Sequence, residues 1–345
     1  MSLSKKMFLT FSILVILNGC ASSTPKSILL QYKEADYTVI PLQEFEEGTM
    51  EIRYVENDLI YGQVYDTTKN FIYFNTVDLY CFDLKTKQLE WKNYQKFERI
   101  MDYMNVAENM YYYEYFGIQE NTLATFYRFI DGKSDEKLYE EFQSDMFNCP
   151  QFFRYHSSFV LLSVNENNVI TIRIPNESNE LEEKYSYDDL SRCIVATAKM
   201  DGDYLYFEAL NEESKSLYRV NLTNGKRDLV LEHTFDRFTM TSSYIVLHEE
   251  NKELIFNKSG ELLKTYEYDA DFRSARWTSK MKDDGIIVTD FNNNMYYHDL
   301  NDEICYQLSA QNDPIIRSIP VRFLTTDDSI IAESDNTLYQ IQIHL

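Results

Sequence analysis

Leu79-Tyr80-Cys81-Phe82-Asp83-Leu84 has the alternating side-chain pattern of a β-strand. Its aspartate, Asp83, lies near the end of the run, and a turn follows. Similar runs return six more times along the chain. They are Phe126–Phe129, Val169–Ile172, Leu217–Leu222, Leu254–Phe256, Met295–Leu300 and Leu338–Ile341. Successive copies are on average about 43 residues apart, so each copy marks one structural unit of that length.

A second strand-like run precedes every copy. These runs are Leu59–Tyr61, Met110–Tyr113, Phe159–Leu162, Tyr204–Phe207, Tyr244–Leu247, Ile286–Val288 and Ile330–Ala332. Turns such as Thr223-Asn224-Gly225-Lys226 follow several copies and are typical of hairpins. Seven units of this kind predict an all-β fold, a seven-bladed β-propeller of four-stranded antiparallel blades. A stack of β-solenoid coils is the structural alternative, although solenoid repeats are usually shorter.

The two ends of the repeat region suggest how the ring closes. The last copy stops at Leu345 after its third strand, so a fourth strand is missing there. Ile28–Tyr32 and Tyr37–Leu42 are spare strand-like runs before the first unit. We expect one of them to complete the last blade, which would bring the N-terminal chain into the disc beside that blade.

Composition fits one large domain, residues 28–345. Glycine is scarce, with 9 residues, whereas tyrosine (28) and phenylalanine (22) are abundant, and aromatic enrichment favours sheet. The formal net charge of −23 would repel nucleic acid, so we exclude nucleic acid as a partner. Because the charge is spread along the chain, a solvated surface explains most of it.

The N-terminus has the pattern of a lipoprotein signal peptide, residues 1–19. Lys5 and Lys6 precede an apolar stretch that is too short to span a bilayer. The stretch ends in Leu17-Asn18-Gly19-Cys20, which resembles the bacterial lipobox. We therefore expect cleavage before Cys20, palmitate and other lipid on Cys20, a tether over residues 20–27, and an extracytoplasmic protein anchored to the cell membrane. An ordinary secretory signal with an incidental cysteine is the alternative.

Four further cysteines are Cys81, Cys149, Cys193 and Cys305. They lie far apart and show no C-x-x-C spacing. Secretion permits disulfides, but Cys81 and Cys305 lie inside apolar strand patterns. Disulfides and buried free thiols both remain open.

Cys81-Phe82-Asp83-Leu84-Lys85-Thr86-Lys87-Gln88-Leu89-Glu90-Trp91 resembles the repeat of quinoprotein-like bacterial propellers. That repeat ends a strand in aspartate, turns through Thr-Gly and closes on Leu-x-Trp, and here Lys87 stands in place of the glycine. The other copies are more similar to the degenerate propellers of uncharacterised Gram-positive lipoproteins. The resemblance implies a fold and no reaction, and the adjacent-cysteine pair of quinoprotein dehydrogenases is absent from the sequence.

The sequence carries no recognisable catalytic motif. The five histidines include no H-x-x-x-H pair, and no G-x-S-x-G elbow or phosphate-binding glycine loop occurs. We therefore expect no cofactor and no metal site. Asp290–Asn294 and Asp327-Asp328 are rich in oxygen ligands for calcium, but hairpin turns are their simpler interpretation.

An arginine lies just before or within the first strand of each predicted blade. These are Arg53, Arg99, Arg154, Arg192, Arg237, Arg273 and Arg317, about half of the 13 arginines in the chain. First strands of a propeller line its axis, so a ring of guanidinium groups could bind an anionic ligand or an acidic segment of a partner there. The structural alternative is that each arginine forms a bridge to an acid of its own or the next blade, and Glu98 and Asp236 are possible partners.

These observations favour a non-catalytic binding or scaffold module. Its partner would be an envelope protein, a cell-wall polysaccharide or an anionic ligand, reached through faces or loops such as 90–99 and 133–150. An extracellular polysaccharide-active enzyme, a glycosidase or lyase with paired carboxylates at the axis, is the alternative function. An axis filled with apolar side chains or arginine–acid bridges would favour the binding module. Two carboxyl groups within glycosidase range of each other, ringed by aromatic side chains, would favour the enzyme.

Overall fold

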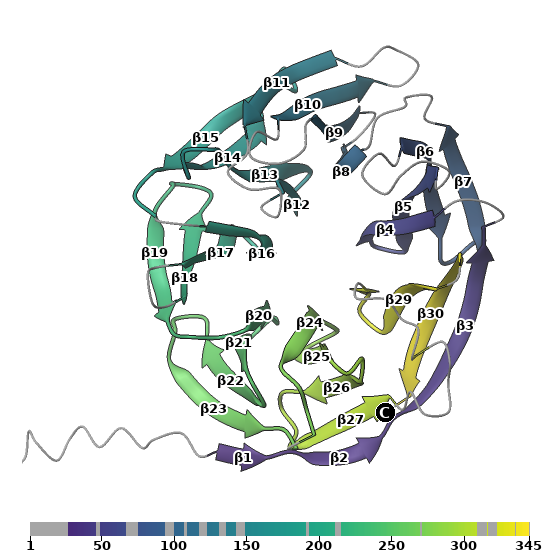
Figure 1. Ribbon diagram of the computed structural model, residues 1–345, viewed down its shortest axis with the longest axis vertical. Helices are drawn as coiled ribbons and strands as arrows, with labels where there is room; N and C mark the ends of the chain where they lie inside the picture. Colours follow the sequence, from purple (N-terminus) through teal and green to yellow (C-terminus); the bar gives the residue numbers. More distant parts are fainter. Residues whose placement is uncertain are drawn as a thin grey trace, which may run out of the picture.

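The computed structural model describes residues 27–45, 49–66, 75–93, 100–106, 109–116, 123–130, 136–142, 149–190, 193–210, 215–269, 271–308, 316, 323–334 and 336–344. Within these residues the strands form seven sheets, which stand as blades round a common axis in chain order (Figure 1). This arrangement confirms the predicted seven-bladed β-propeller.

Each blade has four strands that run antiparallel to their neighbours from axis to rim. Blade 1 contains β4 (Thr49–Glu56), β5 (Leu59–Asp66), β6 (Asn75–Asp83) and β7 (Gln88–Asn93), and blade 2 contains β8 (Ile100–Val106), β9 (Asn109–Phe116), β10 (Leu123–Ile130) and β11 (Glu136–Phe142). Blade 3 contains β12 (Gln151–Tyr155), β13 (Ser158–Val164), β14 (Ile170–Pro175) and β15 (Leu181–Tyr187). Blade 4 contains β16 (Cys193–Asp201), β17 (Tyr204–Leu210), β18 (Lys215–Asn221) and β19 (Arg227–Glu232).

The remaining blades follow the same plan. Blade 5 contains β20 (Arg237–Met240), β21 (Tyr244–Glu249), β22 (Lys252–Asn257) and β23 (Leu262–Glu267), and blade 6 contains β24 (Ala275–Lys280), β25 (Gly285–Asp290), β26 (Met295–Asp299) and β27 (Ile304–Leu308). Blade 7 contains β28 (Leu324–Thr325), β29 (Ser329–Ser334), β30 (Thr337–His344) and the N-terminal strand β3 (Asp36–Glu44). Every copy of the sequence repeat falls on the third strand of its blade.

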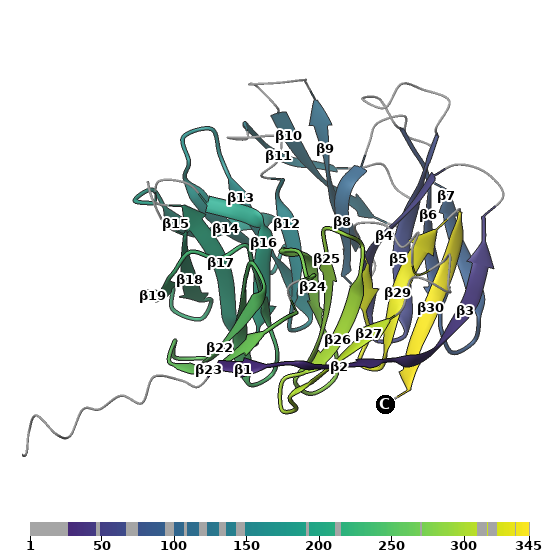
Figure 2. The same ribbon diagram turned by 60° about the horizontal axis from the view of Figure 1, so that its bottom comes forward.

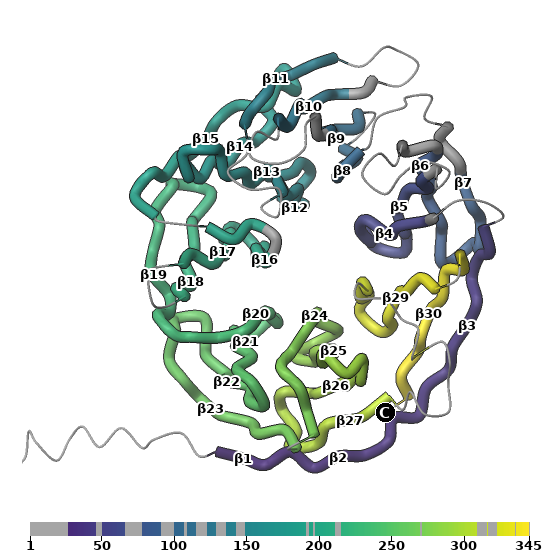
Figure 3. The backbone as a smooth tube through the Cα atoms, viewed as in Figure 1, coloured from purple at the N-terminus to yellow at the C-terminus, as the bar shows by residue number. Residues whose placement is uncertain are grey.

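Strand β3 closes the ring. It runs antiparallel to β30, with Asp36 opposite His344 and Glu44 opposite Thr337, so an N-terminal strand and the last strand share one sheet (Figure 3). Of the two predicted candidates, Tyr37–Leu42 is therefore the run that completes the last blade.

The other N-terminal run forms two short strands on the outside of the ring. Strand β1 (Ser27–Leu29) pairs parallel with β23 of blade 5, and β2 (Gln31–Glu34) pairs parallel with β27 of blade 6 (Figure 2). Leu30, between them, is buried. The expectation that the chain enters the disc beside the last blade is wrong, because Ser27 lies at the rim of blade 5. We call β1 and β2 the strap.

The core lies between blades. Among the described residues, each apolar cluster joins the facing sides of neighbouring sheets; Val160 of blade 3, for example, packs with Leu205 and Phe207 of blade 4. The cluster between blades 1 and 2 is built differently. Its buried members are Leu79, Ile100, Tyr103, Met110 and Tyr112, with more tyrosines packed against them.

The turns between third and fourth strands share one geometry in four blades. An Asp or Asn at the strand end accepts hydrogen bonds from backbone N–H groups of the turn, and a residue three or four positions later has a positive φ. The side chains that accept are Asp83, Asn176, Asn221 and Asn257, and the positive φ values are at Lys87 (57°), Asn179 (61°), Gly225 (72°) and Gly260 (89°). Lys87 therefore occupies the left-handed position that the quinoprotein-like repeat gives to glycine.

The two connections expected to be long loops are partly strand. Residues 133–150 include β11, the outermost strand of blade 2, and residues 90–99 begin inside β7. The rest of both connections, apart from residues 149–150, lies outside the described residues.

Candidate functional site

A cavity of about 950 Å³ opens beside the axis, between blades 6, 7 and 1. The inner strands β4, β24 and β28 contribute to its wall, together with the turns that end them. Its lining is mostly polar and includes Arg53, Asp58, Lys85, Lys87, Ser279, Lys280, Thr325, Asp327, Asp328, Gln340 and Gln342. We call this cavity the axial hollow. Closure of the ring by β3 brings its walls together from both ends of the chain.

Two lysines of the axial hollow project from well-defined backbone positions. Lys87 is exposed on the left-handed residue of the blade 1 turn, and Lys280 is exposed at the end of β24. Their neighbour Lys85 forms an ion pair with Asp58. No ion-pair partner of Lys87 or Lys280 occurs among the residues that the structure describes. Both ammonium groups are therefore available to a ligand.

Arg53, on the inner strand of blade 1, is held inside the wall of the hollow. Its guanidinium lies 2.9 Å from the Glu51 carboxylate and donates to the Tyr65 hydroxyl. Only 6% of its side chain is exposed. Burial lowers the pKa of Arg53, but Tyr65 and Glu51 outweigh that effect and the net pKa is raised. Arg53 thus fits the structural alternative for the arginine repeat.

Arg154 connects three blades. It lies on β12 of blade 3, donates to the carboxylate of Glu56 on β4 of blade 1, and donates to the backbone carbonyl of Asn105 on β8 at 3.1 Å. About a third of each charged side chain is exposed, at 32%. The sequence suggested a partner acid on the same blade or the next one. Arg154 instead binds an acid two blades away.

The other predicted arginines differ from these two. The guanidinium of Arg237 lies 5.1 Å from the centre of the Trp277 ring on the next blade, and the Arg273 side chain is exposed, just before β24. Arg99, Arg192 and Arg317 lie outside the described residues, as does the predicted lipidation site Cys20. The structure therefore brings no ring of arginines together among the described residues, and the binding role of these side chains stays a prediction.

A buried carboxylate beside the inner strand of blade 4 was not predicted. Glu208 on β17 is fully buried, with Lys215 Nζ 3.5 Å away. Burial raises the pKa of Glu208 against the effect of Lys215. Burial likewise lowers the pKa of Lys199 on the inner strand, and Arg237 adds to that effect. Both pKa shifts disfavour the charged form, of the carboxylate in Glu208 and of the ammonium in Lys199.

A second unpredicted group lies between blades 5 and 6. Glu253 is fully buried and accepts hydrogen bonds from His298 Nδ1 at 2.6 Å and from the Tyr268 hydroxyl. His248 Nδ1 lies 3.9 Å from the same carboxylate. His298 and His248 both lie within apolar strand patterns. A histidine at such an inward-facing position is the sequence signal that could have indicated this buried group. Their burial makes this group part of the core.

The four cysteines Cys81, Cys149, Cys193 and Cys305 are thiols and form no disulfide in the described structure. Cys193 and Cys305 are buried in the apolar clusters, whereas Cys81 and Cys149 are half-buried. The question left open by the sequence is thus answered in favour of thiols.

The oxygen-rich segment at Asp290 is a hairpin turn. Asp290 Oδ1 accepts hydrogen bonds from the backbone N–H groups of Asn292 and Asn294 at 2.8 and 2.9 Å. No group of three or more potential metal ligands gathers within the described part of the chain.

Comparison with known proteins supports the fold and gives no family. No protein-family model matches the chain, and no curated protein sequence matches it. A chain of the crystal structure of the mitotic checkpoint complex is similar with a TM-score of 0.53 and 10% identity, over 94% of this chain and 95% of that chain. At 10% identity this similarity shows a shared fold alone.

Two other solved structures are similar at lower scores. The Dos1 propeller matches with a TM-score of 0.48 and 10% identity, over 83% of this chain and 76% of that chain. A chain of the nidogen/laminin complex matches with a TM-score of 0.39 and 12% identity, over 79% of this chain and 96% of that chain.

Proposed function

We propose that this protein is a lipid-anchored, extracytoplasmic β-propeller that binds an anionic partner over its axial hollow. The lipobox at Cys20 supports the anchor and the localisation. No helix in the described part of the chain is long and apolar enough to cross a membrane. The fold supports a binding role, because a rigid ring of blades presents turns of variable sequence on its faces.

The observation that carries the proposal is the pair of exposed lysines at the axial hollow. Of the carboxylates that line the hollow, Asp58 binds Lys85 and Asp328 accepts a hydrogen bond from the Thr326 hydroxyl at 3.3 Å, while Asp327 lines it without an ion pair among the described residues. Lys87 and Lys280 form no ion pair with these three aspartates, so their ammonium groups remain to attract a carboxylate or phosphate group of a ligand. The amide and hydroxyl side chains of the lining can supply further hydrogen bonds.

The enzyme alternative has little support on the inner strand of blade 1. A glycosidase or lyase would need two carboxyl groups free to act on the substrate. The carboxylates of the inner strand of blade 1, Glu51 and Glu56, instead form ion pairs with Arg53 and Arg154. Such bridges favour a binding module over a catalytic one.

The double substitution Lys87→Glu/Lys280→Glu tests the binding role. Inorganic polyphosphate and a short polyglutamate peptide serve as probes, and titration calorimetry measures affinity at two salt concentrations. We expect the double variant to bind roughly three- to tenfold more weakly than the unmodified chain. A stronger effect on polyphosphate than on polyglutamate would identify phosphate as the recognised group, and the reverse result would identify carboxylate.

The matched control is Lys33→Glu/Lys184→Glu, which changes the charge equally at two exposed lysines on the rim, in β2 and β15. Equal loss of affinity in both double variants would mean that the net charge matters and the hollow does not, which would contradict the proposal.

A further inference from the structure

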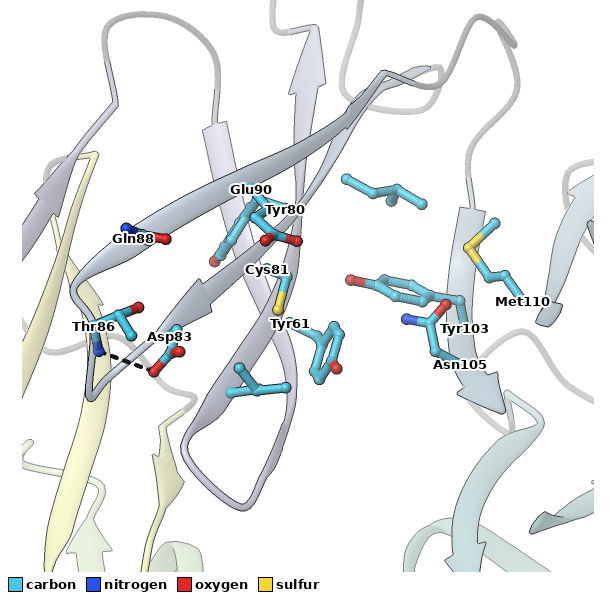
Figure 4. Close-up of a pocket in the computed structure, with 12 residues that line it drawn as sticks. Tyr61, Tyr80, Cys81, Asp83, Thr86, Gln88, Glu90, Tyr103, Asn105 and Met110 are labelled. Carbon is cyan, nitrogen blue, oxygen red and sulfur yellow. Dashed lines mark hydrogen bonds between the residues drawn. The ribbon is translucent and has the colours of Figure 1, made fainter. Parts of the chain in front are cut away.

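A second cavity, of about 560 Å³, lies between blades 1 and 2 (Figure 4). Its volume is in the range of small-molecule sites. It adjoins the tyrosine-rich cluster that joins these two blades. The turn between β6 and β7 of blade 1 lies between this cavity and the axial hollow. Thr86 of that turn lines this cavity, whereas Lys85 and Lys87 of the same turn line the axial hollow. We call it the interblade pocket.

Strand register explains how blade 1 forms one wall of the pocket. Tyr61 on β5 pairs with Cys81 on β6, which pairs with Glu90 on β7, so the three side chains form a row on one face of the sheet. The neighbouring row runs from Leu59 to Asp83 and adds a second carboxylate. All of these residues line the pocket.

The corresponding row of blade 5 shows what is unusual about blade 1. That row consists of Val246, Ile255 and Lys264, and its first two side chains are buried in the cluster between blades 5 and 6. Blade 1 has a tyrosine, a thiol and a carboxylate at the equivalent places. Aliphatic packing is thus replaced by an aromatic and polar surface beside an open volume.

The aromatic side chains are held in place before any ligand arrives. The Tyr61 ring stacks on Tyr54 with a centre-to-centre distance of 4.5 Å. Tyr103 crosses from blade 2 and donates its hydroxyl to the backbone carbonyl of Gly62 at 2.9 Å. Met110 lies beside Tyr103 at the far wall (Figure 4). A preorganised aromatic wall reduces the entropy that a ligand loses on binding.

The charge of the pocket is negative. Hydrogen bonds from the backbone of Thr86 and Lys85 lower the pKa of Asp83, so it is ionised at neutral pH, and Glu90 is exposed. Burial raises the pKa of Cys81, and burial raises the pKa of Tyr61 to about 12, so both are neutral. No lysine or arginine is among the described residues that line the pocket. Two cations border it, Lys85 beside Asp83 and Arg154 beside Tyr61, and they form ion pairs with Asp58 and Glu56.

We infer that the interblade pocket binds an organic cation of the alkylammonium or quaternary ammonium type. The half-buried Tyr61 ring offers such a cation the face that does not stack on Tyr54, and the two carboxylates add electrostatic attraction. An anionic ligand would be repelled, and a neutral ligand would gain no charge–charge attraction from Asp83 and Glu90. The pocket is independent of the proposed binding at the axial hollow, which needs the opposite charge.

Choline and its neutral carbon analogue 3,3-dimethylbutan-1-ol test this inference on the full-length chain. The two compounds have nearly the same shape and differ in charge. We expect calorimetry to detect binding of choline and much weaker binding of the alcohol. Equal binding of the two, or no binding of choline, would overturn the inference, and tighter binding of glucose than of choline would indicate a sugar site instead.

Two substitutions locate the binding. Glu90→Gln should weaken choline binding roughly three- to fivefold, because Glu90 is exposed and water screens its charge. Tyr61→Leu should weaken it about three- to tenfold through loss of the aromatic face. Glu182→Gln, at another exposed glutamate on the fourth strand of blade 3, is the matched control and should leave choline binding unchanged. Choline binding that survives both pocket variants unchanged would place the ligand elsewhere.

None of these variants should alter polyphosphate binding. The failure of one hypothesis therefore leaves the other intact.

Discussion

His248, Glu253 and His298 are ionisable residues that folding buries completely. Burial lowers the pKa of His298, but the Glu253 carboxylate outweighs it and the net pKa is raised. Burial raises the pKa of Glu253, but His298 outweighs it and the net pKa is lowered. These two side chains therefore form a charged pair, while burial lowers the pKa of the third, His248, to about 4.

His248 should make the fold sensitive to acid. In the unfolded chain a histidine takes up a proton below a pH of about 6.5, but native His248 stays neutral until about pH 4, so stability falls as the pH drops between these values. The loss amounts to roughly 3 kcal/mol at pH 4. We expect His248→Leu to remove this loss, and urea denaturation at pH 7, 6 and 5 measures it.

Leucine should be tolerated at position 248, because neither ring nitrogen of His248 has a hydrogen-bond partner in the described structure. The control is His344→Leu at an exposed position in β30, which should leave the pH profile unchanged. His298 should have the opposite effect on stability. Because its pKa is raised in the native state, it stabilises the fold at low pH, and this contribution is lost as the pH rises. An unaltered slope in His248→Leu would assign the acid sensitivity to other groups.

Individual residues were predictable where local geometry determines them. The repeat placed Lys87 at a glycine position, and its backbone is left-handed there. The arginine positions were also visible, but their partners were not. Arg154 binds Glu56, 98 residues away and two blades distant, and no sequence spacing indicates such a pair.

The strap is an element that stabilises two blades without belonging to the repeat. Tyr32 anchors it: its ring centre lies 6.5 Å from that of Tyr268 and 6.0 Å from that of Tyr296. Its hydroxyl accepts a hydrogen bond from the backbone N–H of Asp269 at 2.8 Å. The strap thus adds a side-chain contact to the parallel pairing of β1 and β2.

Tyr32→Ala should destabilise the fold by about 2 kcal/mol, because it removes the aromatic contacts on blades 5 and 6. Tyr32→Phe keeps the ring and should cost less than about 1 kcal/mol, since water can replace the hydroxyl at this partly exposed site. Urea denaturation measures both. Trypsin should also cut Tyr32→Ala after Lys33 faster than the unmodified chain. If Ala and Phe were equally stable, the strap would not depend on this ring.

Element positions in the repeat region were predictable because hairpin turns and alternating patterns are local. The second and third strands of all seven blades were located in this way. The strap was not predictable, because its pairing depends on the outer edges of β23 and β27, which lie more than 200 residues away. Ile28–Tyr32 reads as a strand of either the last blade or another sheet, and only the folded ring selects its partner.

At the scale of the whole molecule, the strap determines where a lipid tether would meet the disc. Ser27 lies on the rim of blade 5, at the outer edge of β23. The seven residues from Cys20 to Lys26 can span at most roughly 25 Å. A lipid on Cys20 would therefore keep the rim of blade 5 nearest to the membrane. The axial hollow opens beside the axis of the disc. With the rim of blade 5 nearest to the membrane, a partner could therefore still reach the hollow.

Cys20→Ser should release the protein from the membrane into the medium in folded form. The physical reason is that the apolar clusters and the ring closure all lie within residues 27–344, so the lipid contributes anchoring alone. Fractionation of cells that express the variant measures release, and the urea midpoint measures folding. The released protein should bind polyphosphate as the lipidated form does in detergent. Retention in the membrane fraction would refute the lipid anchor, and release of an unfolded chain would mean that the N-terminus has a role in folding as well.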